Sequence, residues 1–424
     1  MSVPANGVTA PANPRAFDIA IVGGGMVGAS LAVALAPLGL KIVLVEAVPH
    51  GDASQPSFDE RTTALSNGSR RILETLGVWP NVQPLATPIR KIHVSDQGRF
   101  GFARIDAAEQ GLAAMGYVVP NRALGSALWS RLQVHANVEV RCPAQVSRVR
   151  AGERAVTLEI AQGAAAANLD TKLVVAADGV QSAVRSAFGV DAESRDYEQT
   201  AVITTVLPQR FHDHVAYERF TGSGPLALLP LEGGRCTLVL TLSRETAESA
   251  MTWSDQEFLA EVQRRFGFRL GRFLKVGRRV PYPLSLTRAA RTSAGRCVIV
   301  GNAAQGLHPV AGMGFNLGLR DVASLAELIA EHRHEPDFDA GAAGLLAEYD
   351  AWRAADRGGV IAFTDGLVRM FANPSSVVRR LRNAGLLAFD LLPPAKAALS
   401  RLSTGAGVSG SARVPKLARG VALQ

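Results

Sequence analysis

Hydrophobic residues follow two different patterns along this chain, and each predicts a different kind of β-strand. Short continuous apolar runs occupy residues 17–22, 41–45, 173–177 and 297–300. Such runs are typical of strands buried on both faces of a parallel sheet. The first run is followed by GGGMVG and by a helical stretch, ASLAVALAPLG, before the second run begins. The N-terminal segment therefore predicts a strand, a glycine turn, a helix and a parallel strand.

Alternation of apolar and polar residues marks other segments. It covers residues 138–160 and 200–241, which predicts hairpins and an antiparallel sheet, and short strands are expected over 90–104. Helical spacing predicts helices over residues 64–76, 121–134 and 255–266, one ending near 333, and a helical region over 344–400 broken at Pro374 and at Pro393-Pro394.

These elements predict an α/β protein with a Rossmann-like parallel-sheet domain, an inserted, mostly antiparallel-sheet domain and a C-terminal helical region. We assign residues 17–77, 105–185 and 285–343 to the first domain, 78–104 and 186–284 to the second, and 344–424 to C-terminal helices and a basic tail. Residues 1–16 lack the basic start and apolar run of a signal peptide and are expected to form a flexible leader.

Composition and charge narrow the class of protein. The chain has 424 residues, of which 47% are hydrophobic, enough for a large core. Its net charge is +8, and residues 377–424 carry eight basic and one acidic side chain, so 8 − 1 = +7 lies in the tail. A nearly neutral body argues against a nucleic-acid partner. The three cysteines are widely spaced and the histidines form no ligand pattern, so neither a disulfide framework nor a metal site is predicted.

The first glycine motif predicts a dinucleotide cradle. Gly23, Gly25 and Gly28 follow the first strand and open the helix, where they allow a tight turn, a close approach to a pyrophosphate and close helix–strand packing. Glu46 ends the next strand, where a carboxylate can accept the hydroxyls of an adenosine ribose, which favours FAD or NAD over NADP. Another GxGxxG match begins at Gly405, but no strand precedes it, so we interpret it as part of a mobile tail.

Two further turns extend this site. Asp178 and Gly179 end a buried strand, although an ordinary aspartate-capped connection to the next helix explains them equally well. The segment from residue 301 to 321 reads GNAAQGLHPVAGMGFNLGLRD and again runs from a strand through a glycine-rich loop into a helix. The loop's backbone N–H groups can hold a phosphate or an electron-rich ring.

Together the three segments resemble the FAD fingerprints of the p-hydroxybenzoate hydroxylase-like flavoprotein monooxygenases, over roughly residues 17–370. ERTTALS from residue 60, VPNRAL from residue 119 and the third segment are similar to the ubiquinone-biosynthesis hydroxylases, and within them to the 2-polyprenyl-6-methoxyphenol hydroxylase branch. The resemblance implies a set of FAD-binding residues: Gly23, Gly25, Gly28, Glu46, Arg61, Arg122, Asp178, Gly179, Asn302, Pro309, Gly312, Met313, Gly314, Phe315 and Asn316.

The resemblance gives these residues specific places. It implies that Arg122 lies near the flavin phosphate or ribityl chain, Asp178 beside the pyrophosphate and Asn302 at the ribityl chain, with residues 312–316 at the isoalloxazine. Asn302 replaces the aspartate that is commonest in the wider superfamily, and Met313 stands where glutamine is frequent. His308 is the one catalytic candidate, because a titratable group in this loop could relay a proton, although it could equally anchor the loop.

The activity implied is hydroxylation of a polyprenyl phenol in ubiquinone biosynthesis, with 2-polyprenyl-6-methoxyphenol as the foremost substrate. NADH or NADPH would reduce the flavin, O2 would add to it, and the resulting hydroperoxide would oxygenate the ring. The alternatives are a hydroxylase of another small aromatic compound and a non-catalytic flavin-bound scaffold. The isolated tryptophans lack the WxWxIP stretch of flavin halogenases.

A lipophilic substrate raises the question of where the protein works. We expect a cytoplasmic protein, and the basic residues 377–424 could hold it at the inner membrane or against other quinone-biosynthesis proteins. A solvated basic tail is the equally weighted alternative.

Overall fold

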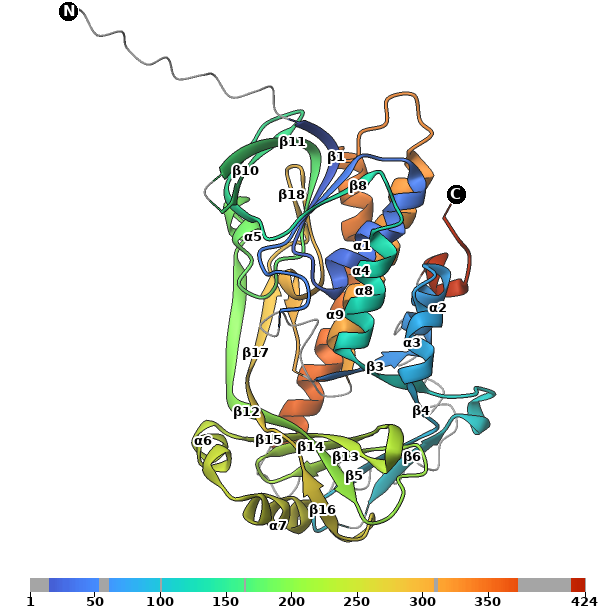
Figure 1. Ribbon diagram of the computed structural model, residues 1–424, viewed down its shortest axis with the longest axis vertical. Coiled ribbons are helices and arrows are strands. Elements are labelled where there is room, and N and C mark those ends of the chain that lie inside the picture. Colours follow the sequence, from blue (N-terminus) through green and yellow to red (C-terminus); the bar gives the residue numbers. More distant parts are fainter. Residues whose placement is uncertain are drawn as a thin grey trace, which may run out of the picture.

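The computed structural model describes residues 15–52, 61–99, 101–163, 165–308, 312–372 and 413–423. Two sheets lie one above the other along the long axis of the molecule (Figure 1). The long strands β12 (Ala192–Pro208) and β17 (Val280–Ala289) run between them. The protein is thus an α/β protein with one sheet built on a parallel core and one mostly antiparallel sheet, as predicted.

The first sheet has a parallel core in the order β19-β11-β1-β2-β8. Its strands are β1 (Arg15–Val22), β2 (Ile42–Val45), β8 (Val138–Arg141), β11 (Ala165–Ala176) and β19 (Cys297–Ile299). The antiparallel strands β9 (Gln145–Ala151), β10 (Val156–Gln162) and β18 (Ser293–Ala294) extend it. All four continuous apolar runs therefore lie in one parallel sheet, which confirms the interpretation of the pattern.

Long helices cover one face of this sheet: α1 (Met26–Leu35), α4 (Asn121–Leu132), α8 (Met313–His332) and α9 (Ala343–Ala372). Leu31 of α1 and Leu325 of α8 are fully buried in one apolar cluster with Ile19 and Leu44 of the sheet. Burial of this apolar surface fixes α1 and α8 against the strands that carry the glycine turns. The predicted break at Pro393-Pro394 lies outside the described residues.

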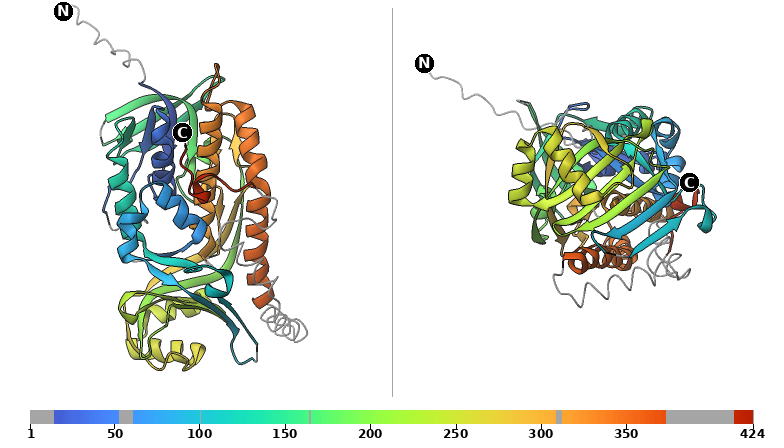
Figure 2. Two further views of the ribbon diagram at one scale, coloured as in Figure 1. Left: turned by 90° about the vertical axis from the view of Figure 1, so that its right-hand side faces the viewer. Right: turned by 90° about the horizontal axis from the view of Figure 1, so that it is seen from below.

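The second sheet has the order β20-β17-β12-β15-β14-β13-β5-β6, and β16 pairs with β12. Its other strands are β5 (Lys91–Asp96), β6 (Phe102–Asp106), β13 (Val215–Thr221), β14 (Gly224–Pro230), β15 (Cys236–Ser243), β16 (Phe273–Val276) and β20 (Gln305–Gly306). Helices α6 (Arg244–Thr252) and α7 (Asp255–Phe266) pack on its outer face, as the view from below shows (Figure 2). Helix α7 has the predicted bounds because a capping box at Ser254 and Glu257 fixes its start.

A three-stranded sheet lies between the two, formed by β3 (Thr62–Ser66), β7 (Gly116–Pro120) and β4 (Thr87–Ile89). The helix predicted over 64–76 begins later than expected. Residues 62–66 pair with β7, and Ser66 then caps α2 (Asn67–Thr75) by accepting the Ser69 N–H at 3.2 Å. The helix starts later than predicted because residues 62–66 pair with another strand, which the local helical spacing does not show.

The chain's last described segment corrects the prediction of a mobile C-terminus. Arg413 contacts the carboxylates of Glu327 and Glu331 on α8, and Lys416 contacts Glu331 at 3.3 Å. Leu417 and Leu423 are buried in the cluster that contains α2 and α8 residues, and the segment lies beside them in Figure 2. Local composition predicted mobility, but carboxylates and apolar side chains of distant elements hold residues 413–423. The second GxGxxG match lies outside the described residues.

The predicted domain boundaries stay a prediction, although β17 runs across the one placed between residues 284 and 285. Among the residues that the structure describes, none of the helices is both long and apolar enough to cross a membrane.

Candidate functional site

The first glycine turn is held against the strand that carries the second motif. Gly23 has a φ of 105°, and a Cβ placed there would lie 2.4 Å from the carbonyl oxygen of Ala177. A Cβ on Gly28 would lie 1.9 Å from the Gly23 oxygen. Gly25 is the N-cap of α1 and supplies no side-chain cap, so the first N–H groups of the helix are left for a ligand.

Glu46 closes one side of this turn at the end of β2. Its side chain is 8% exposed, and its Oε2 accepts the Gly24 N–H at 2.5 Å while Oε1 accepts the Val48 N–H at 2.8 Å. These bonds fix the carboxylate beside the glycine turn. Each oxygen retains acceptor capacity for a ribose hydroxyl.

The second motif forms the cap that the alternative interpretation described. Asp178 accepts hydrogen bonds from the Ser182 hydroxyl and, at 3.1 Å, from the Val184 N–H at the start of α5 (Ala183–Ala187). Gly179 has a φ of 87°, and open space surrounds the position of its missing Cβ. The Asp178 carboxylate therefore orders this turn by capping α5, so any role of Asp178 at the pyrophosphate would be shared with capping.

Arg185 was assigned no role from the sequence. The side chain is buried and donates to the Val180 oxygen at 3.0 Å and to the Ala303 oxygen at 2.8 Å. It thereby ties the second motif to the third. Its spacing after Asp178 was visible in the sequence, but its carbonyl partner on a segment more than 100 residues away was not.

The third motif leads from β19 into the N-terminus of α8. Asn302 is exposed directly after the strand, in the position expected for a polar contact to a ligand. Gly312 has a φ of 60° and is the N-cap of α8 without a side-chain cap. Gly314 has open space around its missing Cβ, Phe315 is partly buried and Met313 is buried. Pro309 lies outside the described residues.

Asn316 does something more specific than the sequence indicated. Its Oδ1 accepts the Ser66 N–H at 2.8 Å, and its Nδ2 donates to the Ala64 oxygen at 2.8 Å and the Gly312 oxygen at 2.7 Å. The side chain is thus bound to backbone on both sides. It fixes the Gly312 turn against β3. Asn316 would therefore act on a bound ligand by positioning that turn.

The two remaining motifs, from residues 60 and 119, lie side by side because β3 pairs with β7. The Asn121 N–H donates to the Arg61 oxygen at 2.9 Å, and the Thr63 hydroxyl to Asn121 Oδ1 at 2.7 Å. Arg61 extends over the Tyr282 ring of the second sheet, with 4.3 Å between its guanidinium carbon and the ring centroid. Arg122 is exposed in the first turn of α4.

His308 is buried, and its ring meets that of Tyr197 edge to face at 5.3 Å. Burial lowers the pKa of His308 to about 4, so the imidazole is neutral at pH 7. A base with such a low pKa takes a proton from a phenol poorly. The residue lies in the predicted loop, and its catalytic role stays a prediction.

Acidification is expected to destabilise the protein through His93 and His308. Burial lowers the pKa of both rings to about 4. Between about pH 6.5 and 4 the unfolded chain binds more protons than the folded protein, so the free energy of unfolding falls as the pH drops through this window. Each ring should cost about 2 kcal/mol at pH 5. Thermal unfolding at pH 7.5 and pH 5 of the wild type and of His93→Phe measures this, and an equal loss in both proteins would contradict it for His93.

Behind the third motif lies a buried network of charges. Asp321 Oδ2 accepts the Gly301 N–H at 3.1 Å and the Gln305 amide at 2.8 Å, and its Oδ1 accepts from Arg353 at 2.8 Å. Arg353 also pairs with Asp356 at 2.6 Å, which in turn pairs with Arg320 at 2.7 Å. These side chains connect α8 and α9 to the turn that carries Asn302.

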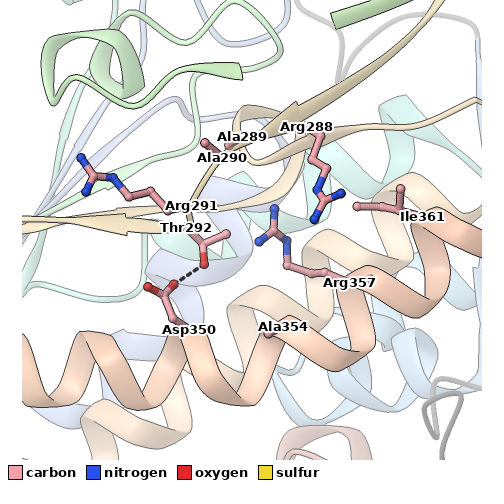
Figure 3. Close-up of a pocket in the computed structure, with 10 residues that line it drawn as sticks. Arg288, Ala289, Ala290, Arg291, Thr292, Asp350, Ala354, Arg357 and Ile361 are labelled. Carbon is pink, nitrogen blue, oxygen red and sulfur yellow. Dashed lines mark hydrogen bonds between the residues drawn. The ribbon is translucent and has the colours of Figure 1, made fainter. Parts of the chain in front are cut away.

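A pocket of about 250 Å³ lies where the chain from β17 to β18 meets α9. Arg288 and Arg357 point their guanidinium groups toward one another, whereas Arg291 points away (Figure 3). Asp350 accepts hydrogen bonds from Thr292 and Ser293. The pocket thus combines two converging cations with one carboxylate already engaged.

Three turns at the carboxyl ends of parallel strands, with two helix N-termini that lack side-chain caps, define a dinucleotide-binding α/β protein, and the antiparallel sheet is typical of its flavoprotein branch. Residues 16–364 match the model of a family described as FAD binding domain. The chain belongs to this family and is an FAD-dependent aromatic-ring monooxygenase.

Similarity to individual proteins supports this assignment. The chain is 38% identical to the ubiquinone hydroxylase UbiL of Rhodospirillum rubrum, over 96% of this chain and 94% of that protein. It is 32% identical to the 3-demethoxyubiquinol 3-hydroxylase of Escherichia coli, over 88% and 94% respectively. The crystal structure of p-nitrophenol 4-monooxygenase PnpA from Pseudomonas putida shares the fold, with a TM-score of 0.75 at 20% identity, over 92% of this chain and 99% of that one.

Proposed function

We propose that this protein hydroxylates the aromatic ring of a polyprenyl phenol in ubiquinone biosynthesis, using NADH or NADPH and O2. The observation that carries the proposal is the 38% identity to a ubiquinone hydroxylase across nearly the whole of both chains. We further propose 2-polyprenyl-6-methoxyphenol as the substrate. The relative named as a 3-demethoxyubiquinol 3-hydroxylase favours a second candidate, hydroxylation of a demethoxylated ring at a later step.

The residues described above fit FAD. Bound FAD supplies reducing power from NAD(P)H and an activated oxygen. The turn at Gly23–Gly28 and the start of α1 would bind the pyrophosphate, and Glu46 the ribose. Asn302 would bind the ribityl chain, while the N–H groups after Gly312 would face the ring system and favour negative charge on it.

Other residues would act on the site without touching FAD. Arg185, Asn316 and Asp321 would hold the three turns in register through their backbone hydrogen bonds. The second sheet would cover the ring and exclude water, which protects reactive species from side reactions.

Two measurements test the proposal. NAD(P)H oxidation by the holoenzyme should depend on a short-chain polyprenyl phenol and yield one hydroxylated product per NAD(P)H. A deletion strain should accumulate the precursor of the missing step, which separates the two substrate candidates. An unchanged quinone profile would refute the pathway, and FAD binding without phenol-dependent turnover would favour the non-catalytic scaffold.

The arginine pocket supports a phosphate-bearing co-substrate. Arg288 is exposed and forms no ion pair with a carboxylate in the described part of the chain, so its guanidinium is available to a pyrophosphate. We expect Arg288→Ala to raise the KM for NAD(P)H about 3- to 10-fold, the loss of roughly 1 kcal/mol, with kcat for a saturating reductant little changed. Arg235→Ala, a change of an exposed arginine in the turn before β15, serves as control. Equal KM values for NAD(P)H in Arg288→Ala and Arg235→Ala would argue against this pocket.

The predicted membrane or protein contact of residues 377–424 stays a proposal, because residues 377–412 lie outside the described residues. Truncation would also remove the docked residues 413–423. Neutralising Arg379, Arg380 and Arg382 is therefore the cleaner test. Undiminished binding of that variant to anionic vesicles would refute their role.

A further inference from the structure

Glu218 occupies an unusual position in the second sheet. Its neighbour Tyr217 packs against Phe266 of α7 on the outer face, with ring centroids 5.3 Å apart. Ala216 instead clusters with Met115 and Val118 of the inner side. Because side chains alternate along a strand, Glu218 shares the face of Ala216 and points toward the FAD-binding half.

The cross-strand neighbours of Glu218 are apolar. Register places Val94 on β5 and Ala227 on β14 directly opposite it, and the same row continues through Val239 on β15 to Ile203 on β12. All five side chains are only partly buried. A carboxylate therefore lies in a band of apolar side chains that remain accessible although the face is turned inward.

Residues next to the flavin motifs contact this face on both sides of that row. The Thr62 hydroxyl lies 2.9 Å from that of Thr237, one row away. Arg61 covers Tyr282, whose partner Ala201 lies in the row on the other side. Residues 61 and 62 thus contact the rows on either side of the row that contains Glu218.

The carboxylate has no hydrogen bond or ion pair with any residue in the described part of the chain. Desolvation alone raises the pKa of Glu218 to about 7. The side chain nevertheless keeps accessible surface on the inward face of the sheet. The charged or titratable groups on the neighbouring rows are Asp96 on β5, and Tyr282 with Arg61 above it; Arg219 points to the opposite face.

We propose that Glu218 is the polar anchor of the substrate site, where its carboxylate binds the hydroxyl of the phenol ring, takes up its proton and selects against rings that carry a carboxylate. The phenol O–H bond breaks, a carboxyl O–H bond forms, and the electron pair stays on the phenolate oxygen, so no redox partner is required. The ring of the phenolate is more electron-rich than that of the neutral phenol, which favours oxygen transfer to it. The apolar row beside it accommodates hydrocarbon.

This inference rests on the proposed hydroxylase function and adds a residue to it. An unpaired carboxylate within a row of apolar side chains costs stability, which is typical of groups kept for function. A second carboxylate on the substrate would meet Glu218 in a poorly solvated space, and like charges there repel strongly.

The test compares Glu218→Gln, Glu218→Asp and the control Glu232→Gln, an exposed glutamate in the turn between β14 and β15, as FAD-loaded enzymes. With a short-chain prenylated 2-methoxyphenol, wild-type kcat/KM should rise through about pH 7 as Glu218 ionises. Glu218→Gln should lose that rise and about 10²- to 10⁴-fold in rate, with FAD content unchanged. Glu218→Asp should retain the pH dependence at a lower rate, and Glu232→Gln should match the wild type.

Selectivity and binding give independent readouts. The preference of the wild type for the phenol over 4-hydroxy-3-methoxybenzoate should fall at least about tenfold in Glu218→Gln, because the like charge is gone. If no variant hydroxylates the phenol, the proposed function fails, and the flavin absorbance change on phenol binding still tests Glu218. Equal phenol affinity, pH profile and selectivity in wild type and Glu218→Gln would overturn the inference.

Discussion

Gly23→Ala is expected to yield a protein that does not retain FAD. The new Cβ would lie 2.4 Å from the Ala177 oxygen and 2.8 Å from the Asp178 N, both backbone atoms of the adjoining strand and turn. The φ of 105° is also one that alanine rarely adopts. The turn must shift, and it moves the N-terminus of α1 and the second motif together. Overpacking and strain of this kind cost about 1–3 kcal/mol each, so we expect at least a 100-fold loss of FAD affinity.

The control for this change is Gly344→Ala at the start of α9, where open space surrounds the added Cβ. It should keep FAD and wild-type stability. Flavin absorbance after purification, titration of the apoprotein with FAD and circular dichroism separate loss of cofactor from loss of fold. A yellow, fully loaded Gly23→Ala protein would show that the first turn does not bind the cofactor.

Arg353→Ala is expected to cause the largest loss of stability, about 3–5 kcal/mol. The side chain is 2% exposed and bridges Asp321 and Asp356, which are themselves buried. Its removal leaves Asp321 without its cation in a poorly solvated interior. Because Asp321 also accepts the Gly301 N–H, the turn that carries Asn302 should loosen, and FAD affinity should fall with stability.

An exposed ion pair provides the comparison. Arg244 and Asp196 meet at 2.5 Å, with 56% and 54% of their side chains exposed, and Arg244→Ala should cost less than about 1 kcal/mol. Arg353→Lys should recover part of the loss because it restores the charge without the two-sided geometry. Chemical denaturation and FAD titration of all three variants provide the measurements. Equal stabilities of Arg353→Ala and Arg244→Ala would refute a structural role for the buried network.

Much of the fold followed from local pattern. The continuous apolar runs predicted the parallel strands because a strand covered on both faces has no polar side to display. Helix α7 was predicted residue for residue, since its capping box and amphipathic spacing are local signals. The predicted start of α2 was wrong because residues 62–66 pair with β7. The predicted mobility of residues 413–423 was wrong because this segment contacts carboxylates from a distant part of the chain.

The site residues likewise divide into those that local sequence could predict and those whose roles depend on distant partners. The glycine turns and Glu46 could be predicted because the constraint on each acts within one strand–turn–helix unit. Arg185, Asn316 and Arg353 could not be assigned their roles, because their partners lie 32 to 252 residues away. In the sequence, Glu218 is a glutamate between Ala216 and Phe220 on one strand face. That pattern does not distinguish it from a glutamate on a solvent-exposed strand face.

By itself, the sequence determined which segments are buried strands, where the backbone must turn without a side chain and hence which cofactor class the chain can hold. Those properties depend on neighbouring residues and on the steric limits of each turn. Only the tertiary structure decided which face of the second sheet turns inward, which carboxylate lies there and which cations neutralise the interior. Desolvation and charge pairing depend on atoms brought together from distant parts of the chain, and no local pattern encodes them.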